Sequence, residues 1–166
     1  MIMVIINHSI FSHIYTTPMK FEEKYLRTKQ YIGLFSIIIL LIACSTGSYV
    51  EIGDNRVFVE IATTQQDQMK GLQQRESLEK ESGMLFVWET ERNISMWMKD
   101  TLIPLDMIFI DSDRKIVTIA NAEPCIVDVC KYYTANTPIQ YVLEVNQGWS
   151  EKHDVHVGDT VEMQIQ

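Results

Sequence analysis

Short apolar runs of strand length, separated by turn signals, make up most of residues 49–166 and constrain the fold more than any other feature. The runs are "YVEI", "RVFVEIA", "SGMLFVW", "ISMWM", "LDMIFID", "KIVTIANAE", "IQYVLEVN" and "TVEMQIQ". The turn signals "GDN", "SDRK", "NQG" and "VGD" lie between them. Helical character is limited to "TTQQDQMKGLQQR" and one turn in "GWSEKHD". We therefore predict a mainly β (α+β) fold, a compact antiparallel β-barrel or sandwich-like domain with one or two short helices.

The segment "ISMWMKDTLIPLDMIFID", residues 94–111, carries charged side chains inside an apolar run. Strand alternation places Trp97 and Lys99 on one face and Met96 and Met98 on the other. In the second half of the segment, Asp106 shares a face with two isoleucines. Because Pro104 cannot donate to a strand ladder, "KDTLIP" is predicted to be a loop. This loop is expected to bring Lys99 and Asp106 together at one end of a hairpin.

Three carboxylates alternate with apolar residues in the predicted strands, namely Glu60, Asp106 and Glu144. An acid in a half-buried strand usually points into solvent, and this interpretation suits Glu60 and Glu144. For Asp106, in an almost wholly apolar run, burial and solvation fit the pattern equally well. A buried carboxylate needs a cation or several hydrogen-bond donors. The natural partners for Asp106 are Arg75, Lys99 and Thr101.

Residues 19–44 have the pattern of a bacterial export signal. The basic stretch "MKFEEKYLRTKQ" precedes "YIGLFSIIILLIAC", an uncharged apolar stretch shorter than the roughly 20 residues that a membrane-spanning helix needs. Its end, "LIAC", resembles the lipobox of bacterial lipoproteins, in which the signal peptidase cuts before the cysteine and that cysteine receives lipid. The resemblance implies lipidation of Cys44, and a cysteine inside a membrane helix is the alternative. Several acyl chains would hold the protein stably at a membrane surface.

The lipobox implies a division of the chain into three parts. Residues 1–44 are the signal peptide, in which residues 1–18 are interpreted as lying upstream of the true start at Met19. Residues 45–48, "STGS", form a tether, and residues 49–166 form a single β-rich domain.

The charge of the exported part limits its partners. Without residues 1–44, the chain keeps 10 basic and 20 acidic residues, a net charge of −10. This charge excludes nucleic acid and electrostatic docking on anionic lipid. The expected partners are a membrane, reached through lipid on Cys44, and an unidentified small molecule or envelope protein. Because Ser45 is not Asp, resemblance to lipoproteins of diderm bacteria implies the periplasmic face of the outer membrane, if the cell has one.

Cys125 and Cys130, in "PCIVDVC", are the two remaining cysteines of the exported part. In an oxidising compartment such a pair predicts a local disulfide that holds a loop in place. The alternative is a zinc site completed by His153 and His156, which is a weaker pattern. No cofactor or metal is predicted.

Four motifs resemble the signature of the domain of unknown function 192 family. They are Gly-Leu-x-x-Arg at Gly71, Leu72 and Arg75, Gly-Met-Leu-Phe at Gly83 to Phe86, Trp-Met-Lys-x-Thr-x-x-Pro-Leu-Asp at Trp97 to Asp106, and Leu-Glu-Val-Asn-x-Gly at Leu143 to Gly148. The resemblance runs from about Val57 to Val161. Small departures are Asp100, where Asn is common, and Gln73, where Met is common. The resemblance implies a compact, mostly β domain, often exported, with no established activity.

Three functions fit these patterns. The first, which we favour, is non-catalytic binding of a ligand or partner by a polar patch on a rigid β scaffold. Its candidate residues are Arg75, Trp97, Lys99, Thr101, Asp106, Glu60 and Glu144. The second is a hydrolase of envelope glycans in which two of the three strand carboxylates act as acid and base. The third is a structural lipoprotein whose charges pair with one another. No catalytic residue is assigned.

Overall fold

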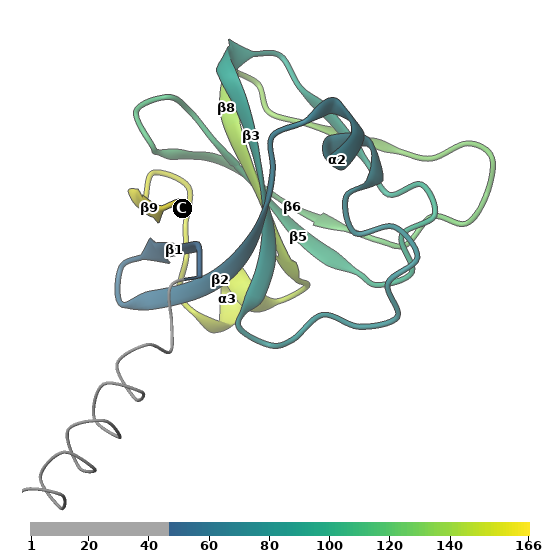
Figure 1. The fold of residues 1–166 in the computed structure, drawn as a ribbon, viewed down its shortest axis with the longest axis horizontal. Helices are drawn as coiled ribbons and strands as arrows, with labels where there is room; N and C mark the ends of the chain where they lie inside the picture. The colour runs from purple at the N-terminus through teal and green to yellow at the C-terminus, as the bar shows by residue number, and fades with distance from the viewer. Residues whose placement is uncertain (1–46) are drawn as a thin grey trace, which may run out of the picture. The chain divides into compact units, whose positions relative to one another are not determined.

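A computed structural model describes residues 47–166 of the chain (Figure 1). The predicted signal peptide and Cys44 lie outside these residues. The strands are β1 (Tyr49–Ile52), β2 (Asn55–Ala62), β3 (Ser82–Arg92), β4 (Ser95–Trp97), β5 (Leu105–Ile110), β6 (Ile116–Ala122), β7 (Tyr132–Thr134), β8 (Ile139–Asn146) and β9 (Val161–Gln164), and the helices are α2 (Gln65–Lys70) and α3 (Trp149–Lys152). This confirms the predicted mainly β class with short helices. In the described residues, no helix is both long enough and apolar enough to span a membrane.

Seven strands form one sheet in the order β6-β5-β8-β3-β2-β1-β9. Neighbouring strands pair antiparallel, except β2 and β3, which are parallel. The parallel pair arises because α2 and the following loop carry the chain back before β3 begins, whereas an antiparallel pair needs only a tight turn. The predicted antiparallel arrangement therefore contains one parallel pair.

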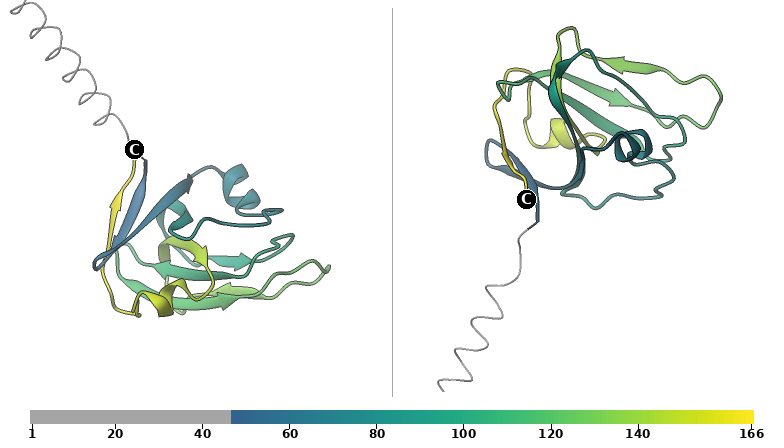
Figure 2. Two further views of the ribbon diagram at one scale, coloured as in Figure 1. Left: turned by 90° about the horizontal axis from the view of Figure 1, so that it is seen from below. Right: turned by 45° about the horizontal axis from the view of Figure 1, so that its top comes forward.

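The sheet curls until its two edge strands approach each other at one end (Figure 2). Lys115, just before β6, bridges to Thr160, just before β9. The amide of Ile116 donates to the carbonyl of Asp159 at 3.0 Å, and the amide of Gly158 donates to the carbonyl of Ile116 at 2.8 Å. These bonds satisfy backbone groups that an open edge would expose. The result is a curled half-barrel.

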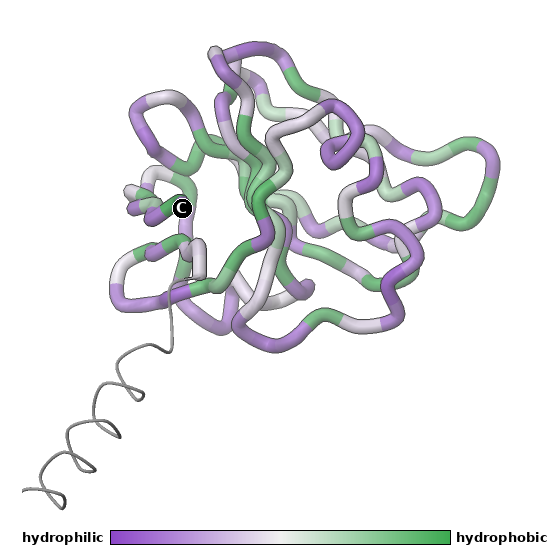
Figure 3. The backbone as a smooth tube through the Cα atoms, viewed as in Figure 1, coloured by the Kyte–Doolittle hydropathy of each residue, from purple (hydrophilic) through white to green (hydrophobic). Residues whose placement is uncertain are grey.

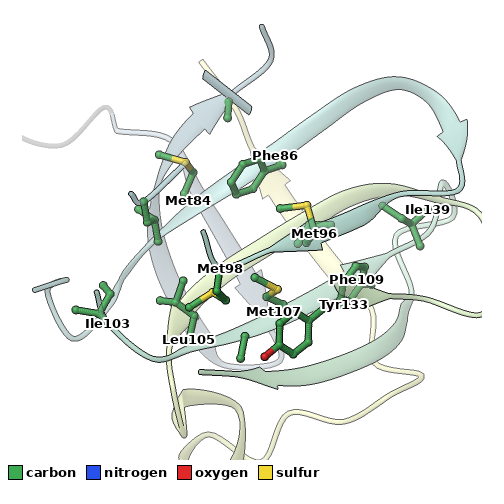
Figure 4. Packing of buried hydrophobic residues seen from close by; sticks show 14 residues of the cluster. Met84, Phe86, Met96, Met98, Ile103, Leu105, Met107, Phe109, Tyr133 and Ile139 are labelled. Atoms are coloured by element: carbon green, nitrogen blue, oxygen red, sulfur yellow. The ribbon is translucent and has the colours of Figure 1, made fainter. Parts of the chain in front are cut away.

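One face of the sheet carries a methionine-rich core (Figure 4). It consists of Ala62, Leu72, Met84, Phe86, Met96, Met98, Ile103, Leu105, Met107, Phe109, Ala122, Tyr133, Ile139 and Val142. Methionine is flexible and fills irregular gaps, which suits a core assembled from strands, loops and the end of a helix.

The other face carries an aliphatic core, and hydrophobic residues recur along the central strands of the backbone trace (Figure 3). It consists of Val50, Ile52, Val57, Leu85, Ile108, Ile110, Ile116, Leu143, Val145, Trp149, Val155 and Val161. All six residues of β5 are buried, because alternate side chains enter the two cores. Burial on both faces explains why the sequence of this strand is almost continuously apolar.

A second, two-stranded sheet of β4 and β7 lies over the methionine-rich core. Met96 and Tyr133 are register partners that point into this core, while Trp97 and Tyr132 are register partners that remain exposed. The sequence analysis did not predict β7. Its three residues form a strand because they pair with β4 and so complete the cover of the core. This pairing depends on tertiary contacts, which the local sequence does not reveal.

Candidate functional site

A cleft of about 630 Å³ opens on the side of the methionine-rich core. Its walls come from α2 and the residues after it, from the end of β3, and from β4. The polar and aromatic lining residues are Gln65, Gln68, Lys70, Gln73, Phe86, Trp88, Arg92, Asn93, Ser95, Trp97, Thr101 and Glu144. This volume lies within the range of clefts that bind small molecules.

Glu144 lies on β8 and contributes to the floor of the cleft. The sheet register places Met84 of β3 on one side of it and Met107 of β5 on the other. Its side chain is only 4% exposed, and within residues 47–166 no group donates a hydrogen bond to its carboxyl group. Burial therefore raises the pKa of Glu144 to about 8, so the carboxyl group is mostly protonated at neutral pH. The expectation of an outward, solvated Glu144 is wrong, because β8 is a central strand between β5 and β3 and the side chain lies at the bottom of the cleft.

Thr101 and Trp97 line the same cleft. Thr101 is 5% exposed; its amide donates to the carbonyl of Met98 at 3.0 Å, while no hydrogen bond to its hydroxyl is found in the described part of the chain. Trp97 is 44% exposed at the rim and stacks on Tyr132, with ring centroids 6.1 Å apart and planes 10° apart. Of the seven predicted patch residues, Trp97, Thr101 and Glu144 are brought together in one cleft.

Glu60 and Arg75 pair with each other outside the cleft lining. The guanidinium donates two hydrogen bonds to the carboxylate, and the Nη2–Oε2 distance is 2.7 Å. The hydrogen bond from Arg75 lowers the pKa of the Glu60 carboxyl group. Glu60 is the register partner of Met84, which in turn is the partner of Glu144, so the two acids share a face of the sheet two strands apart.

Lys99 binds the loop that follows β6. Its ammonium group donates to the carbonyl of Val127 at 3.1 Å and lies 4.0 Å from the carboxylate of Asp128. The next amide, of Asp100, donates to the carbonyl of Cys125 at 2.9 Å. The family motif is therefore tied to a loop nearly 30 residues further along the chain.

Cys125 and Cys130 form a disulfide, with Cα atoms 5.9 Å apart, which confirms the predicted bond. Both sulfurs are used by this bond, so neither is a thiolate ligand for zinc. His153 instead stacks on Trp149, with ring centroids 4.6 Å apart. Across residues 47–166, no group of three or more His, Cys, Asp and Glu side chains has a metal-binding arrangement.

Asp106 faces the aliphatic core, on the opposite side of the sheet from the cleft. It is fully buried and accepts three hydrogen bonds: from the amide of Gly148 at 3.1 Å, the amide of Ser150 at 2.9 Å, and the side chain of Asn121 at 2.8 Å. A buried carboxylate with several donors, one of the two arrangements considered, is therefore the one found. The predicted partners Arg75, Lys99 and Thr101 are wrong, because these N–H groups satisfy the carboxylate and Lys99 binds elsewhere.

Sequence reasoning missed several residues that line the cleft, among them Trp88, Arg92 and Gln68. The Gln68 side chain donates to the carbonyl of Val87 at 2.9 Å and so joins α2 to β3. The glutamines in and just after α2 were a usable signal, since they give this short helix a polar surface that can line a cleft. No signal in the sequence indicates that the end of β3 reaches this cleft.

The fold and the cleft define a small β-rich domain with room for one small molecule. The chain belongs to the domain of unknown function 192 family, described as "Uncharacterized ACR", which matches residues 48–163. This confirms the family resemblance seen in the sequence. A search of curated proteins gave no match.

Two crystal structures are similar to this chain. One, a candidate transcription regulator from Sinorhizobium meliloti 1021, is 34% identical, with a TM-score of 0.63 over 70% of this chain and 91% of its own. The other, a protein of unknown function from Novosphingobium aromaticivorans DSM 12444, is 35% identical, with a TM-score of 0.63 over 69% of this chain and 82% of its own.

Proposed function

We propose that this protein is an exported lipoprotein, anchored through Cys44, whose β domain binds a small ligand in the cleft without catalysing a reaction. The observation that carries the ligand proposal is the pair of buried polar side chains in the cleft, Glu144 and Thr101. Neither side chain makes a hydrogen bond within residues 47–166, and both line the cleft, so their polar atoms are available to a ligand from outside the chain. Trp97 supplies a flat apolar surface beside them.

The test of ligand binding is a thermal shift of the purified full-length protein with envelope sugars, muropeptides, nucleotides and metal ions. A ligand at 100 times its dissociation constant adds about 2.7 kcal/mol of stability, which is a readily measured shift. Glu144→Leu and Thr101→Val are expected to abolish the shift while the protein stays folded. A shift that both variants retain in full would contradict binding in this cleft.

Lys99→Ala tests whether the binding surface extends beyond the cleft. Lys99 contacts only the disulfide loop and its neighbours in the residues described, so the substitution is expected to change stability little. If the patch predicted from the sequence is a single surface, Lys99→Ala also removes ligand binding. Unchanged binding would confine the site to the cleft residues.

The anchor is tested by metabolic labelling with an alkyne-bearing fatty acid. The wild-type protein is expected to carry the label, and Cys44→Ser is expected to lose it and to accumulate as an uncleaved precursor. The double variant Cys125→Ser/Cys130→Ser is the matched control and should keep the label. Labelling of Cys44→Ser would contradict lipidation at this cysteine.

A glycan hydrolase is a second candidate, and one observation favours it. Glu60 and Glu144 lie on one face of the sheet with pKa values displaced in opposite directions, as in acid–base pairs. Two strand spacings place their backbones roughly 10 Å apart, and inverting enzymes hold the two carboxyl groups themselves roughly 6.5–9.5 Å apart. Against it, Glu60 is held by Arg75 and does not line the cleft. Release of reducing ends from a bound glycan, lost in Glu60→Gln, would establish this activity.

DNA regulation, which the name of the Sinorhizobium relative suggests, is not proposed for this chain. Its exported part has a net charge of −10, and binding to a phosphate backbone depends on Lys and Arg contacts.

A further inference from the structure

The hydrogen-bonding groups of the cleft are mostly uncharged and include both donors and acceptors. Gln68 and Gln73 use their side-chain NH₂ groups on backbone carbonyls, at 2.9 Å to Val87 and 3.0 Å to Met69. Their side-chain oxygens have no donor among residues 47–166 and are available as acceptors. Glu144 and Thr101, at the floor, carry O–H groups that can donate. A ligand that satisfies this set must itself present several groups that both donate and accept, as hydroxyl groups do.

Flat aromatic surfaces stand beside these polar groups. Trp97 and Tyr132 form one stacked pair at the rim, with their planes 10° apart. Phe86 and Trp88 form another, with centroids 6.3 Å and planes 15° apart. Trp97, Phe86 and Trp88 all line the cleft. An aromatic plane packs well against a ring whose face presents only C–H groups, and Trp97 is exposed enough to receive one.

The charged side chains of the cleft argue against cationic ligands and against phosphate esters. In the described part of the chain, the charged side chains that line it are Lys70, Arg92 and Glu144. A cationic ligand would meet two cations and a carboxyl group that burial keeps mostly protonated. A phosphate ester would need a cluster of donors, whereas Lys70 and Arg92 are exposed residues at the ends of separate elements. The lining therefore favours a neutral or acidic molecule rich in hydroxyl groups.

We propose that the ligand of this cleft is a saccharide, with the C–H face of one ring stacked on Trp97 and hydroxyl groups hydrogen-bonded to Glu144 and Thr101. This inference rests on the proposed ligand-binding function and names its chemical class. The stacked Tyr132 holds the Trp97 ring in one plane and so acts as a positioning residue. An acidic sugar would gain an additional contact with Arg92 or Lys70 at the rim.

The test is isothermal titration of the purified full-length protein with three saccharides and two non-saccharides. The saccharides are the tetramer of N-acetylglucosamine, cellotetraose and tetragalacturonic acid, and the non-saccharides are ATP and benzoate. Trp97→Ala is expected to weaken saccharide binding at least tenfold, and Glu144→Leu to a similar extent, with Glu144→Gln restoring part of the affinity through its amide donor. The matched control is Phe58→Ala, because Phe58 is 45% exposed, as Trp97 is, and lies outside the cleft.

The outcomes separate this inference from the function on which it rests. Binding of a saccharide that weakens in Trp97→Ala and Glu144→Leu, and not in Phe58→Ala, supports both. If only ATP or benzoate binds, and this binding is lost in Glu144→Leu, the proposal that the ligand is a saccharide is overturned. The proposed binding function is then still supported. Saccharide binding that is equal in all variants places the sugar elsewhere and overturns the inference. Absence of binding by every probe at millimolar concentration overturns both.

Discussion

Two buried acids of this domain, Asp106 and Glu144, have opposite surroundings. Asp106 receives three N–H donors, two of them from the backbone at the start of α3, and so joins β5 to β6 and to the helix. Glu144 has no such donors in residues 47–166 and faces the cleft. The hydrogen bonds of Asp106 are complete within residues 47–166, whereas the carboxyl group of Glu144 has no partner among them. We therefore assign Asp106 to the stability of the fold and Glu144 to the proposed binding site.

Asp106→Asn is expected to lower the free energy of unfolding by about 3 kcal/mol, because hydrogen bonds to a charged group are strong and the new NH₂ group would face another N–H donor. Urea denaturation followed by circular dichroism measures the loss. Asp113→Asn, at an exposed turn, is the control and should change stability by less than about 0.5 kcal/mol. Equal midpoints for Asp106→Asn and the wild type would show that the three bonds contribute little.

Glu144 makes the stability of the protein depend on pH. Its pKa is 4.5 in a solvated chain and about 8 in the fold, so between these values the folded chain retains a proton that the unfolded chain releases. The contribution of Glu144 to the free energy of unfolding is therefore highest below pH 4.5 and falls as the pH rises toward 8, by up to about 1.4 kcal/mol per pH unit.

Glu144→Gln removes this dependence, since the amide does not titrate. Its stability relative to the wild type is expected to rise from near zero at pH 4.5 to a gain of a few kcal/mol at pH 8. Urea midpoints measured across this pH range give the difference. Glu89→Gln, at an exposed position of β3, is the matched control. A difference between Glu144→Gln and wild type that stays constant with pH would contradict the burial of a titrating carboxyl group.

The sequence identified Asp106 and Glu144 as unusual, because each is an acid in an apolar strand. It assigned the wrong partner to Asp106, because strand alternation was carried through residue 99. In the structure β4 ends at Trp97, and the backbone turns at Asp100 with a φ of 56°. Asn and Asp tolerate this left-handed conformation better than most residues, and the family commonly has Asn at this position. The turn sends Lys99 toward the disulfide loop and away from Asp106.

At the scale of the elements, the pairing of β3 with its neighbours depends on a glycine, Gly83, which has no side chain. Gly83 begins the Gly-Met-Leu-Phe motif and lies between β2 and β8. A Cβ atom here would lie 2.5 Å from the carbonyl oxygen of Glu144, and 3.1 Å and 3.2 Å from methyl groups of Val145 and Val57. The nearest of these atoms belongs to the backbone of a central strand, which cannot move without disturbing the sheet register.

Gly83→Ala is therefore expected to lower the free energy of unfolding by about 3 kcal/mol, measured by urea denaturation. The matched control is Gly47→Ala, because a Cβ atom at Gly47 would meet nothing within 4 Å. A loss in Gly83→Ala no larger than in the control would mean that β3 and β8 separate at low cost.

The disulfide loop shows how one element positions another. Closure of so short a loop restricts the unfolded chain only modestly, by about 2 kcal/mol in the chain-entropy treatment. The loop also contacts the family motif through Cys125 and Val127, and β7 follows it and pairs with β4. Through these contacts the loop and β7 are joined to the family motif on both sides, at Trp97 and next to Thr101.

At the scale of the whole molecule, one curled sheet separates two cores and shares its strands between them. Because β5 contributes alternate side chains to both cores, formation of one core is expected to be coupled to formation of the other. The domain is therefore expected to unfold in a single cooperative transition.

Trp149 lies in the aliphatic core and Trp88 packs against the methionine-rich core, so the two report on opposite faces. The variant Trp88→Phe/Trp97→Phe keeps only Trp149, and the variant Trp97→Phe/Trp149→Phe keeps only Trp88. In each variant, the tryptophan fluorescence and the far-ultraviolet circular dichroism are expected to change at the same urea concentration. Distinct midpoints within either variant would show that the two faces unfold separately.

The sequence by itself determined the strand-rich class, the helix that follows Thr64, the disulfide and the family, because period-2 patterning, capping residues, cysteine spacing and linear motifs are local properties. Only the tertiary structure decided the parallel pairing of β2 with β3, the strand β7, and the closure of the sheet. It also decided which acids face the cleft. Segments distant in the chain determine which face of a strand is covered. They also determine which groups donate hydrogen bonds to a buried acid. Glu144 and Asp106, similar in sequence context, therefore lie on opposite faces of one sheet and have different roles.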